Sequence, residues 1–162
     1  MTTQTILVDY NNTSQTQDLI ALLDAYAQDP MGGAEPLSAY TKKNLIAALQ
    51  SQPQVFSVMC YVDDKPAGLV NCVRGFSTFK AKPLVNIHDI VVSTEYRGQG
   101  ISRLMLQEVE RIARDEGCCK LTLEVLEGNK VAQQAYLNFG FTGYELDPEM
   151  GKALFWEKPL KY

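Results

Sequence analysis

The sequence has few of the residues that a metal centre needs. It contains one histidine and four cysteines, and no two cysteines have the CxxC spacing. Zinc sites are built from cysteines and histidines at such spacings, so we expect no metal site. Three of the cysteines stand in apolar, strand-like segments, where a free cysteine behaves as a small buried hydrophobe. A structural role is therefore favoured over a nucleophilic one for Cys60, Cys72, Cys118 and Cys119.

Long apolar runs and an excess of basic residues are also missing. No apolar run approaches the roughly 20 residues of a membrane-spanning helix, and residues 1–15 lack the basic and apolar segments of a signal peptide. With 15 basic against 19 acidic residues and a formal charge of −4, the chain lacks the basic face of most nucleic-acid-binding domains. We therefore expect a cytoplasmic protein that binds neither membranes nor nucleic acids. Its 162 residues suit one domain over residues 1–162.

What the sequence does contain is an alternation of strand and helix patterns. Short segments rich in β-branched and aliphatic residues predict strands at residues 5–10, 55–62, 67–73, 84–92, 120–126, 141–146 and 153–158. Apolar residues at helical spacing predict a first helix that is capped by Thr13 or Ser14 and runs through about Gln28. The same spacing predicts helices at residues 37–50, 101–116 and 129–138. This order predicts an α/β fold (α+β by some schemes), with a central mixed, mostly antiparallel sheet flanked by about four helices.

The rest of the chain is organised around the segment from Pro83 to Glu116, which reads as a strand, a turn and an amphipathic helix. Polar residues interrupt the strand at Asn86, His88 and Asp89. A buried polar group without a partner costs about 1 to 3 kcal/mol. These side chains must therefore be hydrogen-bonded within the fold or take part in binding or catalysis. Regular alternation places Asn86, His88 and Ile90 on one face of the strand and Asp89 on the other.

The turn between strand and helix has the composition of an anion site. It reads Arg97-Gly98-Gln99-Gly100-Ile101-Ser102. A helix that begins after such a turn presents free backbone N–H groups and the positive end of its dipole. Glycines let the backbone approach phosphate oxygens, and Arg97 adds a charged donor. The alternative is a tight turn without a ligand; the other common phosphate patterns, GxxxxGK[ST] and GxGxxG after the strand, are absent.

These residues carry a resemblance to a known family. The run Ile90-Val91-Val92 and the turn 97–102, together with Asn129, Ala132, Tyr136 and Phe139-Gly140-Phe141, resemble the GNAT superfamily of N-acetyltransferases, which use acetyl-coenzyme A. The family's Arg/Gln-x-x-Gly-x-Gly/Ala turn is met except at its last place, where Ser102 stands. The resemblance is specific from about Gln54 to Lys158; before Gln54 only the order of elements matches.

The resemblance implies a binding site for acetyl-CoA. Its pantetheine arm would lie along the backbone of Ile90, Val91 and Val92, where the strands at 84–92 and 120–126 splay apart. Residues Arg97, Gly98, Gln99, Gly100, Ile101 and Ser102 would hold the pyrophosphate. Asn129 would contact the coenzyme and Tyr136 would donate a proton to the departing thiolate. The alternatives are an N-cap role for Asn129 and a core-edge aromatic role for Tyr136.

Deprotonation of the acceptor amine is the more demanding step of such a reaction. An alkylamine with the pKa of lysine is protonated about a thousandfold at neutral pH, a deficit of roughly 4 kcal/mol, whereas a thiolate leaves with little help. A base therefore matters more than an acid. Histidine titrates near neutral pH, so His88 is the expected base, through a water, with Asp89 in reserve. The alternative for His88 is a satisfied core histidine.

The resulting hypothesis is an enzyme that transfers an acetyl group to a primary amine of a small molecule or peptide by direct attack. The alternative is a non-catalytic module of the same fold that binds coenzyme A or a partner. Residues 31–35, 75–79 and 144–152 would line the acceptor pocket, and an exposed sheet edge makes a homodimer plausible. The sequence does not name the acceptor.

Overall fold

The computed structural model describes residues 1–145 and 147–161. The chain forms two compact units, Met1–Leu126 and Glu127–Tyr162, and each is described by itself. The first unit contains a five-stranded sheet in the order β1-β2-β3-β4-β5. All neighbours are antiparallel except β4 and β5, which are parallel. The strands are β1 (Thr3–Leu7), β2 (Val55–Val62), β3 (Lys65–Ser77), β4 (Lys82–Val92) and β5 (Leu121–Leu123). The predicted α/β fold with a mixed sheet is confirmed.

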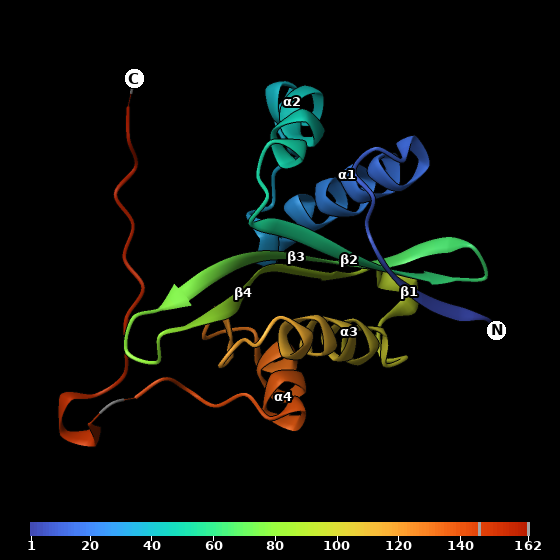
Figure 1. Cartoon of the computed structure of the whole chain (residues 1–162). Helices are drawn as coiled ribbons and strands as arrows, with labels where there is room; N and C mark the ends of the chain where they lie inside the picture. The colour runs from blue at the N-terminus through green and yellow to red at the C-terminus, as the bar shows by residue number, and fades with distance from the viewer. Residues whose placement is uncertain (146, 162) are drawn as a thin grey trace. The chain divides into compact units, whose positions relative to one another are not determined.

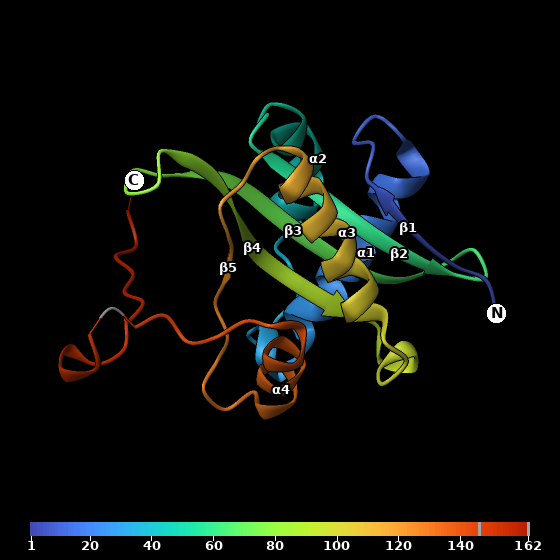
Figure 2. The same cartoon turned by 60° about the horizontal axis from the view of Figure 1, so that its bottom comes forward.

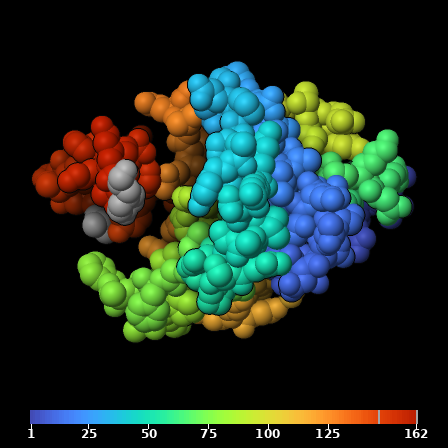
Figure 3. All heavy atoms as spheres, turned by 90° about the horizontal axis from the view of Figure 1, so that it is seen from above, coloured from blue at the N-terminus to red at the C-terminus, as the bar shows by residue number. Residues whose placement is uncertain are grey.

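Helices cover both faces of this sheet (Figure 1). On one face lie α1 (Thr13–Gln28) and α2 (Ala39–Gln50), joined through the short 3-10 helix η1 (Pro30–Gly32). Figure 3 views this face, with the atoms of α1 and α2 in blue to cyan. On the opposite face α3 (Ile101–Asp115) crosses the strands, following the 3-10 helix η2 (Thr94–Tyr96). The second unit holds α4 (Lys130–Phe139) and the 3-10 helix η3 (Pro148–Met150).

Two apolar layers hold the first unit together. Between the sheet and α1/α2 lies a cluster formed by Val8, Leu19, Leu22, Met59, Leu69 and Val91, against which α2 packs Leu45, Ile46 and Leu49. The buried face of α3 is formed by Ile101, Met105, Leu106, Val109, Ile112 and Ala113, with the three- and four-residue spacing of an amphipathic helix. Gly68 permits its close approach, because a Cβ there would lie 2.7 Å from Met105 Cε and 2.9 Å from the Val91 carbonyl oxygen.

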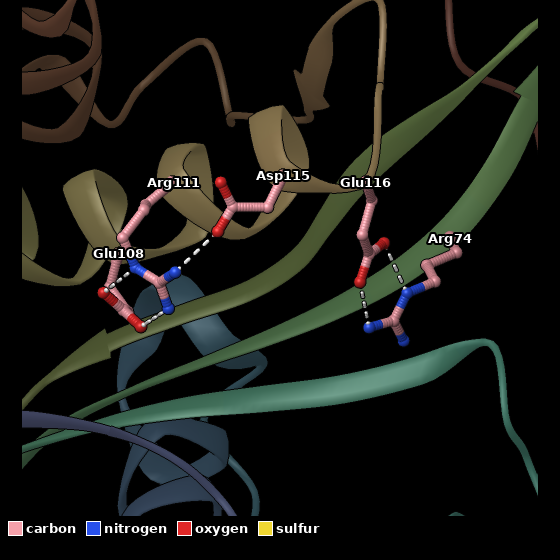
Figure 4. A network of polar contacts seen from close by, with 5 residues as sticks. All are labelled: Arg74, Glu108, Arg111, Asp115 and Glu116. Carbon is pink, nitrogen blue, oxygen red and sulfur yellow. Dashed lines mark hydrogen bonds and ion pairs between the residues drawn. The ribbon is translucent and has the colours of Figure 1, made fainter.

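One ion pair ties the end of α3 to the sheet. Arg74 on β3 donates from Nε and Nη2 to the two carboxylate oxygens of Glu116, both at 2.7 Å, and its Cζ lies 4.4 Å from the centroid of the Phe56 ring. Figure 4 shows it beside Arg111, which pairs with Glu108 and Asp115 within α3. The Arg74 hydrogen bond lowers the pKa of the Glu116 carboxyl, although burial opposes the shift.

Replacing Arg74 by Met is expected to lower the free energy of unfolding by about 1 to 2 kcal/mol, because a bidentate, partly buried pair and a cation–π contact are lost together. Arg111→Met is the matched control: it breaks the ion pairs with Glu108 and Asp115, which are local to one helix and formed by a more exposed arginine, so its loss should be smaller. Urea unfolding measures the loss in both variants.

The loss of unfolding free energy in Arg74→Met should be complete above about pH 4.3, the ordinary pKa of Glu, and disappear as the pH falls through the lowered pKa of Glu116. Equal losses for the two variants would contradict this account.

Two local predictions were wrong. The first helix is capped by Asn12, whose side chain accepts from the Gln15 N–H, and not by Thr13 or Ser14. No strand forms in the described residues 141–145 and 153–158, and Leu146 lies outside the described residues. One backbone hydrogen bond, from Ala153 N–H to the Tyr144 carbonyl at 3.3 Å, joins the two segments, which is too little for a ladder. An alternating pattern becomes a strand only where a neighbouring strand pairs with it.

Among the described residues, no helix is both long enough and apolar enough to cross a membrane.

Candidate active site

The site is built around an irregularity in β4. Asn71 on β3 lies opposite Asp89, whereas the next residue, Cys72, lies opposite Ile87. His88 is therefore the extra residue of a β-bulge. The parallel ladder with β5 covers only the pairs from Val85–Leu121 to Ile87–Leu123, so it ends where the bulge begins. The predicted splay between the two strands is confirmed within the first unit (Figure 2).

The bulge overturns the predicted distribution of side chains on β4. One extra residue shifts the two-residue alternation by one place. Asp89 lies opposite Asn71, and Val91 belongs to the cluster under α1 and α2. Asp89 therefore shares the α1/α2 face with Asn86, and Ile90 lies on the face of α3. The prediction that Asn86, His88 and Ile90 share one face was wrong, and His88 stands exposed at the bulge.

Asp89 ends a chain of side-chain hydrogen bonds. Its Oδ2 accepts from Asn71 Nδ2 at 3.0 Å, and Asn71 Oδ1 accepts from Ser57 Oγ at 2.6 Å. Ser57 Oγ lies 2.8 Å from the Tyr10 hydroxyl. Ser57 is fully buried and Asp89 is partly buried. Two strand residues, Asn71 and Ser57, and Tyr10 after β1 thus hold the Asp89 carboxylate at the face covered by α1 and α2.

The end of α1 brings further charge to this region. Burial raises the pKa of the Tyr26 hydroxyl, and the negative charges of Asp89 and Asp29 raise it further. Asp29 in turn pairs with Arg97, whose Nη2 lies 3.0 Å from Asp29 Oδ2. The Met31 backbone N–H and Arg97 together lower the pKa of Asp29. Arg97 also donates from Nε to the Val92 carbonyl at 3.2 Å, so the turn is tied both to β4 and to the α1–η1 loop.

The turn that starts α3 has the geometry of an anion site. Gly98 and Gly100 have φ values of +75° and +79°, which favour glycine, and a Cβ at either would meet no atom within 4 Å. The N-cap of α3 is Gly100, so no N-cap side chain bonds to the backbone N–H groups of its first turn. Ile101 is buried and anchors the helix, Ser102 is partly buried, and Arg97, Gly98, Gln99 and Gly100 are exposed. These residues fit a diphosphate.

The remaining predicted coenzyme residues divide between the two units. Ile90 and Val92 are partly buried and Val91 is buried, and alternate backbone groups of this strand point away from β3. Asn129 and Tyr136 belong to the second unit. Asn129 is the N-cap of α4 and accepts from Ala132 N–H at 3.2 Å. Tyr136 is buried, with its ring 6.0 Å from that of Phe141 in an edge-on contact.

The cysteines have the character expected of structural residues. Cys60 and Cys72 are fully buried, and Cys118 and Cys119 are partly buried. Burial raises the pKa of Cys72 to about 12 and also raises those of Cys60 and Cys118. A raised thiol pKa disfavours the thiolate that a nucleophile requires.

Three residues of the hydrogen-bonded chain were missed from the sequence. Tyr10, Ser57 and Asn71 lie in strand-like segments as isolated polar residues. The signal that singled out His88 and Asp89, a polar residue inside an apolar strand, also marks Ser57 and Asn71. Asp29 was missed as well, because its pairing with Arg97 joins residues 68 positions apart.

Comparison with known proteins places this geometry in a family. The model of the Acetyltransferase (GNAT) family matches residues 19–141. The chain is 42% identical over 65 residues to thialysine N-epsilon-acetyltransferase of Bos taurus, a match covering 40% of this chain and 38% of that protein. The chain thus spans about two fifths of the length of that curated relative.

Solved structures share the fold at low sequence identity. An aminoglycoside acetyltransferase from an uncultured soil metagenomic sample, in complex with sisomicin, has a TM-score of 0.80 at 17% identity, covering 98% of this chain and 97% of that one. The structure of AAC(6')-Iy with a bisubstrate analogue, CoA-S-monomethyl-acetylneamine, has a TM-score of 0.78 at 13% identity, covering 99% and 100%. The family model spans most of the chain, and the chain belongs to the Acetyltransferase (GNAT) family.

Proposed function

We propose that the chain is an acetyl-CoA-dependent N-acetyltransferase that acts on a primary amine of a small molecule or peptide. The observation that carries the proposal is the turn at 97–102: an uncapped helix N-terminus behind two glycines at positive φ, beside the strand edge that β5 leaves open after Ile87. The family uses acetyl-CoA, and the named relatives are acetyltransferases. The resemblance to AAC(6')-Iy supports the same coenzyme, because the analogue bound there contains CoA.

The coenzyme residues have distinct tasks in this proposal. The backbone of residues 98–102 and the Arg97 guanidinium bind the diphosphate, since N–H groups and a fixed cation are the donors that phosphates prefer. Backbone groups of Ile90, Val91 and Val92 pair with the amides of the pantetheine arm as a strand would. Asn129 contacts the coenzyme from α4. When bound, acetyl-CoA supplies an acetyl group activated as a thioester.

The substrate amine must lose a proton to a base before its nitrogen can attack the thioester. We assign His88, exposed at the bulge, to receive one ammonium proton through a water and to pass it to solvent. Asp89, on the α1/α2 face, accepts a hydrogen bond from the acceptor nitrogen. Tyr136 returns a proton to the departing thiolate. Each ammonium group acetylated forms one amide, releases one thiol and leaves one proton in solution.

Replacing Asp29 by Asn is expected to strengthen coenzyme A binding several-fold. In the wild type the Arg97 guanidinium forms an ion pair with the Asp29 carboxylate, so it is only partly available to the coenzyme diphosphate. The negative charge of Asp29 also repels a diphosphate bound nearby. Calorimetric titration with coenzyme A measures the change. Arg97→Met should have the opposite effect, and weaker binding in both variants would show that Asp29 serves to hold Arg97 in its binding position.

Turnover with a panel of amines tests the proposed activity. The protein is incubated with acetyl-CoA and lysine-like, diamine, aminoglycoside and peptide amines, and free thiol is measured. Amine-dependent thiol release is the expected result. Tight coenzyme binding without turnover on any amine would favour a non-catalytic binding module.

A further inference from the structure

The hydrogen-bonded chain Tyr10–Ser57–Asn71–Asp89 has a defined direction. A carboxylate only accepts hydrogen bonds, so Asn71 must turn its NH₂ group, Nδ2, toward Asp89. Its Oδ1 is then the acceptor for the Ser57 hydroxyl, at 2.6 Å. The single Ser57 hydrogen is thereby used, and Tyr10 must donate to Ser57 Oγ. Each member fixes the next, and the chain ends on one oxygen of Asp89.

The other carboxylate oxygen is left for a ligand. Among the described residues no hydrogen bond reaches Asp89 Oδ1, whereas Oδ2 is held by Asn71. Asp89 is partly exposed and lies beside the bulge where the β4–β5 ladder has ended. Ser57 is fully buried, so the hydrogen-bonded series of side chains is anchored in the core and ends at the partly exposed Asp89 carboxylate.

We propose that Asn71, held by Ser57 and Tyr10, is a positioning residue that presents the Asp89 carboxylate to the ammonium group of the acceptor. The proposal rests on the proposed function and deepens it, because it assigns the acceptor to the class of cationic amines and names the residues that set the direction of its anchor. The Asn71 amide holds the carboxylate in one orientation, which spares the complex the cost of ordering that side chain on binding. Neutral acceptors gain little from this arrangement.

A double-mutant cycle on amine binding tests the inference without requiring turnover. The probe is 1,4-diaminobutane, titrated by calorimetry into the protein saturated with coenzyme A. Asp89→Asn should weaken diamine binding, and Asn71→Leu should weaken it about tenfold, as expected for a lost hydrogen bond to a charged group. In the Asp89→Asn background, Asn71→Leu should change the affinity by less than about twofold, because Asn71 acts only through Asp89.

Matched variants separate positioning from general damage to the fold. Asn86→Leu removes a comparable part-buried amide hydrogen bond on β4, to Thr122 Oγ1 at 2.9 Å, and should leave the diamine affinity unchanged. Ser57→Ala removes only a hydroxyl and should show the same dependence on Asp89 as Asn71→Leu, with a smaller effect. It replaces Asn71→Leu in the cycle if that variant does not fold.

Three outcomes would overturn the inference: no diamine binding by the wild type, an Asp89→Asn protein that binds the diamine as well as the wild type, or an Asn71→Leu effect that is equal in both backgrounds. The proposed function fails separately, if no amine in the panel releases thiol. Asp89-dependent diamine binding without turnover would uphold the anchor and reject the enzyme.

Discussion

Gly100→Glu is expected to weaken coenzyme A binding by at least about a hundredfold while the protein remains folded. The substitution places a carboxylate at the N-terminus of α3, where the proposal puts a diphosphate, and each charged hydrogen bond lost there is worth about 1.5 to 3 kcal/mol. A Cβ at Gly100 meets open space, so the fold bears only the cost of a left-handed non-glycine residue, about 1 kcal/mol. Calorimetric titration with coenzyme A measures the loss, and thermal unfolding shows that the fold persists.

Gly117→Glu is the matched control for that experiment. Gly117 follows the other end of α3 with a φ of +73°, and a Cβ there also meets no atom within 4 Å. Backbone strain and added charge are therefore similar, but the position is away from the turn. Coenzyme affinity should be unchanged in Gly117→Glu. Wild-type affinity in Gly100→Glu would contradict the assignment of residues 97–102.

His88→Ala is expected to lower kcat at neutral pH by about a hundredfold, in the usual range for loss of a general base. Tyr136→Phe should lower it less. The reason is the imbalance between the reacting groups: an alkylamine is protonated about a thousandfold at pH 7, whereas a thiolate needs little help to leave. Steady-state kinetics on an accepted amine, with coenzyme affinity measured separately, compare the two variants.

The pH dependence distinguishes a lost base from a structural defect. In His88→Ala the reaction depends on amine that is already neutral, and that fraction rises about tenfold per pH unit below the amine pKa. The deficit relative to wild type should therefore shrink as the pH rises. A deficit that is constant with pH, or a larger loss in Tyr136→Phe, would remove His88 from the role of base.

Elements with a strong local pattern were predicted well. The first helix was predicted with its correct end near Gln28, and its start was misplaced by one or two residues, since Asn12 and not Thr13 or Ser14 is the cap. The turn at 97–102 was placed between β4 and α3, where the structure has it. There the glycines at positive φ and the change of period from two to 3.6 coincide.

The centre of the candidate site was harder to predict for a physical reason. A bulge is defined by pairing with another strand, so the sequence of β4 alone cannot reveal that His88 is the extra residue. Without it, alternation placed Asp89 on the face opposite Asn86, whereas the two lie on the same face. The hydrogen-bonded chain to Tyr10 likewise depends on the register of three strands. Contacts of this kind follow from tertiary structure and not from local propensity.

In the C-terminal part the sequence predicted strands that the described residues do not form. Alternating apolar residues near Phe155 predicted a strand that the described residues do not form, because the pattern reports suitability for a sheet and not the presence of a partner. The roles of Asn129 and Tyr136 toward the coenzyme, and the homodimer, stay predictions.

The most direct test of the proposed function is the stoichiometry of the reaction. The protein is incubated with acetyl-CoA and an accepted primary amine, and N-acetylated amine is quantified by mass spectrometry beside free thiol. The account predicts one acetylated amine for each thiol released, with both signals lost in Gly100→Glu and kept in Gly117→Glu. Thiol release without acetylated amine, or equal product from both variants, would contradict it.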